Sequence, residues 1–118
     1  MSQAPYRTVD PATGEVAESF PFATDAEVTA IITAADDAHA AWAARSIEER
    51  AGIVARAAEL VGERKHELAA KAHQEMGKAV TEGVEEAEFT QAIFAYYATE
   101  GPKLAADQPI PSSSASNP

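Results

Sequence analysis

The apolar content of this chain is dominated by alanine, and this limits the size of any core that it can build. Hydrophobic residues make up 46% of the 118 positions, yet the only leucines are Leu60, Leu68 and Leu104. Burial of apolar surface contributes about 25 cal/mol per Å², so an alanine face adds little stability. Each helix therefore offers a narrow apolar stripe. The sequence predicts one small domain whose independent fold is marginal.

The charge balance excludes several classes of partner. The formal net charge is −10, whereas nucleic-acid backbones and anionic membrane surfaces are bound by clustered Lys and Arg. No apolar run approaches the roughly 20 residues that a bilayer span needs, and residues 1–5 lack the features of a signal peptide. We therefore expect no nucleic-acid or membrane partner and a cytoplasmic location.

Two extended segments flank a turn near the N-terminus. Tyr6–Asp10 and Glu15–Phe20 are separated by Pro11–Gly14, in which Pro fixes φ and Gly supplies a positive φ. The pattern predicts a β-hairpin. An irregular N-terminal arm is the alternative.

Two capping boxes mark the starts of helices. Thr24 with Glu27, and Ser46 with Glu49, have the spacing in which a hydroxyl and a carboxylate satisfy each other's backbone N–H groups. The first box predicts a helix from about Asp25 to about Ala44, with an apolar stripe at Val28, Ile31, Ile32, Ala35 and Trp42. The second predicts a helix from about Ile47 that continues either as one long helix or as two helices joined near residues 62–65.

Further along, Gly77 is placed to end a helix in the left-handed conformation. A third helical segment is predicted from about Ala79 to Thr99, and Gly101–Pro102 is expected to end it. Its apolar face includes Val80, Val84, Ala87, Phe89, Ile93, Phe94, Tyr96 and Tyr97. The predicted fold class is therefore mainly α with an N-terminal β-hairpin. The hairpin is expected to pack back on the helices.

Residues with possible chemistry are better explained as surface or core. His39, His66 and His73 do not have the i, i+4 spacing of paired metal ligands, so surface histidines are favoured over a metal site. The glutamates 82, 85, 86 and 88 are favoured as solvated charge over an acid–base pair. Lys78 follows Gly77 without a preceding glycine loop for phosphate. Trp42, Tyr96 and Tyr97 are expected in a core or an interface.

Several phrases, in this order, resemble the N-terminal portion of the NAD(P)-dependent aldehyde dehydrogenase family, and within it the bacterial succinate-semialdehyde dehydrogenases. They are Asp10–Glu15, Ala40–Trp42, Glu49–Ala51 leading to Ala57–Leu60, Glu75–Lys78, and Tyr96–Tyr97 before Leu104–Asp107. The likeness covers nearly all of the chain apart from its first few residues and its Ser-rich end. It implies that the chain is a piece of the α/β coenzyme-binding domain of the aldehyde dehydrogenase fold.

The resemblance also implies a reaction that this chain does not complete. In the family a cysteine thiolate adds to the aldehyde, hydride passes to NAD or NADP, and water activated by a glutamate releases the acid. This chain contains no cysteine, and the family's coenzyme turn, general base and cysteine loop are expected beyond Pro118. We therefore name no catalytic, cofactor-binding or metal residue, and expect neither NAD nor NADP to bind this chain alone.

The resemblance yields a division of the chain and two interpretations of its role. Residues 1–5 are expected to be disordered, residues 6–111 to form the incomplete domain, and the tail 112–118 to be disordered. In the first interpretation the chain is a truncated or fragmentary aldehyde dehydrogenase. Its partner is then the remainder of the subunit, within a homo-oligomer. In the second it is a stand-alone helical interaction module descended from such an enzyme.

Overall fold

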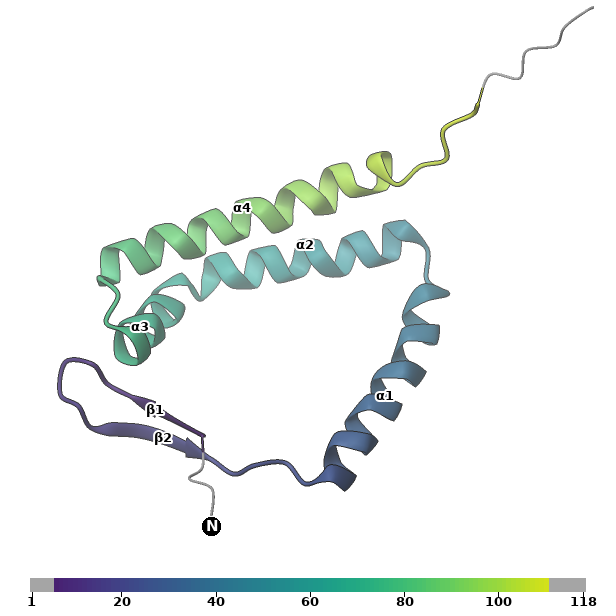
Figure 1. The fold of residues 1–118 in the computed structure, drawn as a ribbon. Coiled ribbons are helices and arrows are strands. Elements are labelled where there is room, and N and C mark those ends of the chain that lie inside the picture. Colours follow the sequence, from purple (N-terminus) through teal and green to yellow (C-terminus); the bar gives the residue numbers. More distant parts are fainter. Residues whose placement is uncertain (1–5, 111–118) are drawn as a thin grey trace, which may run out of the picture.

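The computed structural model describes residues 6–110. Two strands are followed by four helices (Figure 1), in the order β1 (Tyr6–Val9), β2 (Val16–Phe20), α1 (Asp25–Ala43), α2 (Ile47–Glu63), α3 (Lys65–Met76) and α4 (Val80–Leu104). The predicted class, mainly α with an N-terminal hairpin, is confirmed. The predictions of disorder for residues 1–5 and 112–118 lie outside the described residues, as does residue 111 of the predicted domain.

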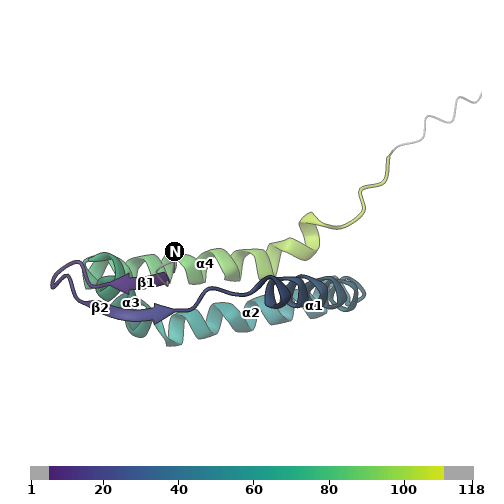
Figure 2. The same ribbon diagram turned by 60° about the horizontal axis from the view of Figure 1, so that its bottom comes forward.

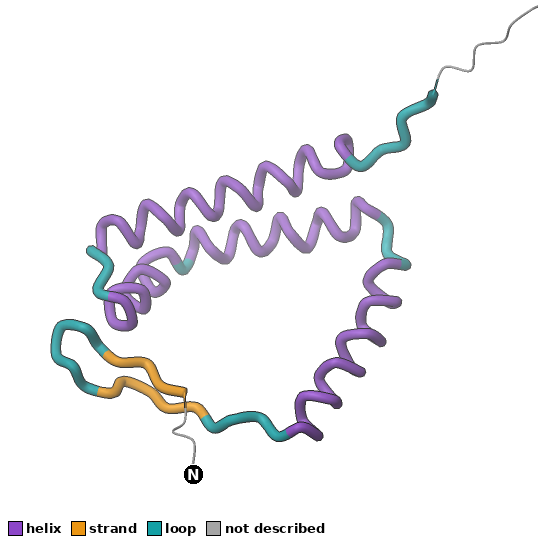
Figure 3. The backbone as a smooth tube through the Cα atoms, in the orientation of Figure 1, coloured by secondary structure: helices purple, strands orange, loops and turns teal. Residues whose placement is uncertain are grey.

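The hairpin forms where the turn residues predict it (Figure 3). β1 and β2 are antiparallel, with Tyr6 opposite Phe20 and Val9 opposite Val16. The register shifts between Thr8 and Val9, so β2 carries one extra residue, a β-bulge. In the turn, Gly14 has a φ of 76° and its N–H donates to the Asp10 carbonyl at 2.7 Å.

Both predicted capping boxes are present. The Glu27 N–H donates to Thr24 Oγ1 at 3.2 Å, and the Thr24 N–H donates to Glu27 Oε2 at 2.7 Å. The Glu49 N–H donates to Ser46 Oγ at 3.1 Å, and the Ser46 N–H to Glu49 Oε2 at 2.9 Å. These reciprocal bonds satisfy backbone donors that a helix start otherwise leaves unpaired. Accordingly, α1 and α2 begin at the predicted residues.

The segment after Ser46 forms two helices rather than one. Arg64 separates α2 from α3 with a φ of −103° and a ψ of 12°. The Arg64 N–H still donates to the Leu60 carbonyl at 3.0 Å, so the chain changes direction without losing this helical bond. At the other end of α3, Gly77 has a φ of 71°, which confirms the predicted left-handed cap.

The prediction that Gly101–Pro102 ends the last helix is wrong, because α4 continues to Leu104 with Pro102 inside it. Proline has a φ compatible with a helix, but it cannot donate the hydrogen bond that a residue at this position would make to the carbonyl four residues earlier, so α4 passes through Pro102 with one bond fewer. Helical bonding continues beyond it, since the Ala105 N–H donates to the Gly101 carbonyl at 2.9 Å.

The helices α2 and α4 lie side by side and α3 packs across one end of α4, as two views show (Figures 1 and 2). The hydrophobic residues buried in this unit are all alanines, namely Ala58, Ala69 and Ala87. Gly83 is also buried, and a Cβ built on it would lie 3.0 Å from Cα of Ala69. The unit is therefore joined by a close approach of small residues, in agreement with the sparse aliphatic content.

The hairpin and α1 are far less enclosed. Every residue of α1 is exposed, including Ile31 and Ile32, each with 64% of its surface accessible. The hairpin touches α3 near Pro11, which lies beside Gly77, and Glu18 Oε2 is 3.7 Å from Lys71 Nζ. The hairpin therefore contacts the helical unit at α3 and at Gly77, which caps it. Across residues 6–110, no helix is both long and apolar enough to cross a bilayer.

Candidate functional site

The three histidines lie apart on the surface. His39, His66 and His73 are exposed, and His73 Nδ1 lies 2.9 Å from the carbonyl oxygen of Lys78, next to the cap of α3. Within residues 6–110, no group of three His, Cys, Asp or Glu side chains is arranged to hold a metal ion. The structure therefore assigns His73 a local contact at the end of α3.

Two glutamates in the first half of α4 form ion pairs with lysines of the preceding segment. Glu88 Oε1 lies 2.5 Å from Lys65 Nζ, and Glu86 pairs with Lys78. The hydrogen bond from Lys65 lowers the pKa of Glu88 below that of a free glutamate, and the bond to Glu86 raises the pKa of Lys78. An acid–base pair needs one protonated and one ionised carboxyl, whereas the lysines favour the ionised form of Glu86 and Glu88. Instead, these pairs connect α4 to α3 and to the turn before α4.

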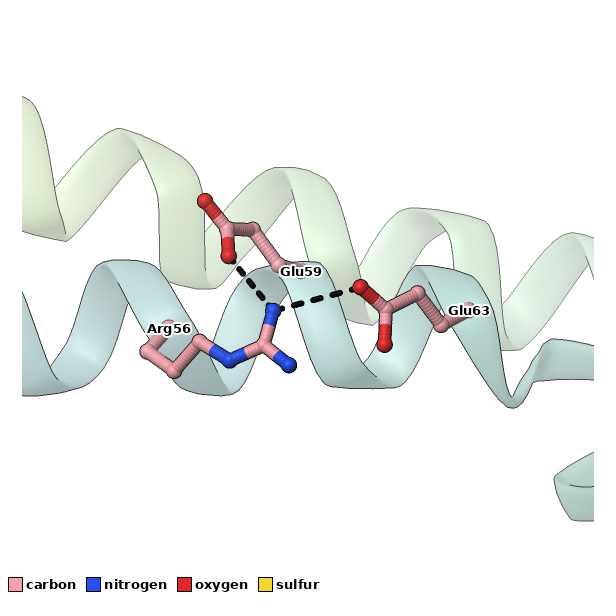
Figure 4. A network of polar contacts seen from close by, with 3 residues as sticks. All are labelled: Arg56, Glu59 and Glu63. Carbon is pink, nitrogen blue, oxygen red and sulfur yellow. Dashed lines mark hydrogen bonds and ion pairs between the residues drawn. The ribbon is translucent and has the colours of Figure 1, made fainter.

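A second ionic cluster lies along α2 (Figure 4). Arg56 Nη1 donates to Glu59 Oε2 at 2.7 Å and to Glu63 Oε1 at 3.2 Å. The bond to Glu59, followed by that to Glu63, raises the pKa of Arg56. More than half of each side chain is exposed, so water and salt screen the interaction. The cluster supports the helix and leaves no unpaired charge aimed at a ligand.

Exposed apolar side chains are the most extensive surface feature of residues 6–110. A hollow of about 390 Å³ lies between α2, α3 and α4, lined by Val61, Leu68, Ala72, Met76, Gly83, Glu86, Ala87 and Thr90. A second hollow, of about 410 Å³, lies between the end of the hairpin and α1, lined by Pro21, Phe22, Ala23, Glu27, Ala30 and Ile31. At its edge the rings of Tyr6 and Phe22 pack edge to face, with centroids 4.6 Å apart.

Three aromatic residues predicted to lie in a core or an interface are exposed. Trp42 has the guanidinium of Arg45 6.0 Å from its ring centroid, and the rings of Tyr96 and Tyr97 lie 5.2 Å apart. All three have at least 39% of their surface accessible, which excludes them from the core of the described chain. That these three residues lie in an interface stays a prediction.

Sequence reasoning missed the hollow between α2, α3 and α4. Its signal was the set of small residues Ala69, Gly83 and Ala87, of which Gly83 and Ala87 are four apart and so share a face of α4. Small residues on facing helices allow close approach of the backbones, and the larger neighbours then form a rim. Their meaning depends on which helices meet, and a single sequence does not provide that.

The N-terminus of α4 does not fit the pyrophosphate of a dinucleotide coenzyme. Such a site needs backbone N–H groups and basic side chains directed at a pyrophosphate. The N-terminus of α4 has Lys78 beside it, but Lys78 is paired with Glu86, and Glu82 adds negative charge in the first turn. The positive charge of Lys78 is therefore taken up by Glu86 and is not directed at the N-terminus of α4.

Comparison with known proteins identifies the lineage of the chain. The sequence model described as "Aldehyde dehydrogenase family" matches residues 1–117. A succinate-semialdehyde dehydrogenase [NADP(+)] from Deinococcus radiodurans is 42% identical over 109 residues, which are 92% of this chain and 23% of that enzyme. The chain thus spans about a quarter of the length of the curated relatives that it matches.

Solved structures agree in fold. A succinic semialdehyde dehydrogenase from Streptococcus pyogenes, in complex with NADP+, superimposes with a TM-score of 0.85 at 25% identity, over 92% of this chain and 24% of that one. A succinate-semialdehyde dehydrogenase from Burkholderia pseudomallei gives a TM-score of 0.78 at 34% identity, over 93% and 23% of the two chains. The arrangement of hairpin and helices is therefore a part of that fold, and the chain belongs to the aldehyde dehydrogenase family.

Proposed function

We propose that this chain acts as the N-terminal scaffold segment of an aldehyde dehydrogenase subunit. The observation that carries the proposal is the match of residues 1–117 to a family whose curated relatives are about four times longer. The exposure of large apolar side chains such as Ile31, Ile32 and Phe89 supports it, because these side chains gain stability only when a further layer covers them.

The reaction proposed for the whole subunit is the oxidation of succinate semialdehyde to succinate with NADP. Support comes from two relatives, the succinate-semialdehyde dehydrogenase [NADP(+)] of Deinococcus and the succinic semialdehyde dehydrogenase of Streptococcus, whose structure contains NADP+. This chain contains no cysteine, so the thiolate that would add to the aldehyde belongs to another part of such a subunit. A cytoplasmic location and a homo-oligomeric assembly are parts of the same proposal.

By this proposal the 118-residue chain alone is inactive. It is expected neither to oxidise succinate semialdehyde nor to bind NAD or NADP, since its basic side chains near α4 are engaged by glutamates. Protein-dependent formation of NADPH by the purified chain, or micromolar coenzyme affinity by calorimetry, would contradict this part of the proposal.

A chimera tests the scaffold role directly. Residues 1–117 replace the matching quarter of the Deinococcus enzyme, and NADPH formation from succinate semialdehyde is compared with that of the parent enzyme. We expect a folded chimera with measurable activity. A chimera that is insoluble or inactive, beside an active parent, would argue against the scaffold role. A sharp cooperative melt of the monomeric 118-residue chain would instead favour the stand-alone interaction module.

A further inference from the structure

Helix α1 carries an apolar stripe that no other element of the described chain covers. The helix leaves the unit of α2, α3 and α4 at the turn before α2 and runs away from it (Figure 1). No residue of α1 is buried, and Ile31 and Ile32 are each 64% accessible. Exposed apolar surface of this kind is typical of a protein–protein contact.

The stripe is arranged symmetrically about Ala35. Val28 and Trp42 lie seven residues to either side of Ala35, and Ile31 and His39 lie four residues to either side. Residues at these separations share one face of a helix. In an antiparallel pair of α1 helices centred on Ala35, Val28 of each copy therefore meets Trp42 of the other, and Ile31 meets His39. The small side chain at the centre allows the two helices to approach closely.

The charges at the two ends of α1 favour this antiparallel pair. The first turn carries Asp25 and Glu27, and Arg45 follows the end of the helix. In the antiparallel pair, Arg45 of each copy lies next to the acidic first turn of the other, and the symmetry makes this contact twice. A parallel pair would bring like charges together at both ends. The other carboxylates, on Asp36 and Asp37, lie about 100° and 200° around the helix from the centre of the stripe.

The exposed apolar side chains of α4 lack this complementarity. Phe89 is 67% accessible, but Glu82, Glu85 and Glu86 lie seven, four and three residues before it and so share its face. Two copies of α4 paired through Phe89 would therefore place carboxylates at the contact. Self-association is thus favoured at α1 and disfavoured at α4.

We propose that the 118-residue chain by itself forms a homodimer in which α1 pairs antiparallel with α1 of a second copy, centred on Ala35. The proposal goes beyond the scaffold role, because a further layer on α1 in a longer subunit would take the place of the second copy. One pair of helices about 28 Å long is a small interface. The dimer is therefore weak and forms at about 100 μM chain or above.

Sedimentation of the 118-residue chain between about 10 μM and about 1 mM tests the pairing. We expect the mass to rise from 12.4 kDa toward that of a dimer. Ile31→Asp places a charge in the stripe and should abolish the rise. Thr33→Asp adds the same charge on the opposite side of α1 and should leave the dimer in place. The melting of the unit formed by α2, α3 and α4 should be the same in both variants, because α1 has no buried residue.

Charge exchange tests the orientation. Asp25→Lys and Arg45→Glu each remove the attraction between the helix ends, and each should weaken self-association by about tenfold. An equimolar mixture of the two variants should dimerise like the unsubstituted chain, because position 25 of one variant then faces an opposite charge at position 45 of the other.

Three results would overturn the proposal. The first is a chain that stays monomeric up to about 1 mM, or a dimer that survives Ile31→Asp. The second is a mixture of the two charge variants that associates no better than either variant alone. The third is slow amide exchange of α1 in the monomer, which would show that another part of the same chain covers the stripe.

Discussion

The two halves of this chain differ in what holds them in place. In α1 the local signals are strong, with a complete capping box, yet the helix has no buried residue. In α4 there is no side-chain cap, yet Gly83 and Ala87 are buried against neighbouring helices. The difference shows that helix formation and tertiary packing are specified separately. Capping needs only residues within one turn, whereas burial needs a second surface.

The sharpest way to break this comparison is to enlarge Gly83. Its Cβ would lie 3.0 Å from both Cα and Cβ of Ala69, so Gly83→Leu must push α3 and α4 apart. We expect a loss of about 3 kcal/mol in the free energy of unfolding, measured as loss of helical signal in urea. Gly52→Ala is the control, because a Cβ there meets nothing within 4 Å and should stabilise α2 by up to about 1 kcal/mol. Equal effects of the two substitutions would show that the close approach does not hold the unit together.

Hydrogen exchange sharpens the comparison without any substitution. Amide protons on the packed sides of α2 and α4 should exchange at least about tenfold more slowly than those of α1, because opening them requires separating the helices. Mass spectrometry of peptides from Asp25–Ala43 and Val80–Leu104 measures the ratio. Equal protection in the two helices would mean that α1 packs in solution, contrary to its complete exposure here.

The capping boxes provide a smaller and more local test. Thr24→Ala and Ser46→Ala each remove a bond to a backbone N–H and should cost about 1 kcal/mol. Loss of the Thr24 cap should fray α1 alone, whereas loss of the Ser46 cap should also lower the stability of the unit formed by α2, α3 and α4. Amide exchange in α4 distinguishes them. Faster exchange of α4 in Thr24→Ala would show that α1 is coupled to the rest.

The smallest expected effect comes from acidification. The hydrogen bond from Lys65 lowers the folded-state pKa of Glu88, and hydrogen bonds from the backbone and side chain of Thr24 lower that of Glu27. A lowered folded pKa means that the stabilisation is complete above the unfolded value, about 4.3 for glutamate, and is lost as the pH falls through the folded value.

Glu88→Gln and Glu27→Gln should therefore reduce the acid sensitivity of the two regions separately. The loss of helical structure is followed by amide exchange from neutral to strongly acidic pH. Glu88→Gln should make this loss less dependent on pH in α3 and α4, and Glu27→Gln should do so in α1. The effects should be small, because both groups are accessible to solvent and screened. An acid transition identical to that of the unsubstituted chain in both variants would assign the transition to other carboxylates.

The features predicted correctly from the sequence are those whose partners lie within a few residues. Thr24 with Glu27, Ser46 with Glu49, and the left-handed Gly77 all satisfy their own turn of backbone. The break at Arg64 was left open because no Gly or Pro marks the break itself. The passage of α4 through Pro102 was missed because the φ of proline is itself helical, so one proline near a helix end does not fix where the helix stops. The hollow was not predicted, since it arises where three helices meet.

The contact between Gly83 and Ala69 reverses the usual ranking of which positions in a domain are sensitive to change. In most small domains the large aliphatic residues tolerate substitution least, because they fill the interior. Here Ile31, Ile32 and Phe89 are exposed, and the smallest side chains form the only buried seam of the described chain. In a mutational scan of the isolated chain, polar replacements of the largest apolar residues should therefore be tolerated. Larger side chains at Gly83 and at the buried alanines should not be tolerated.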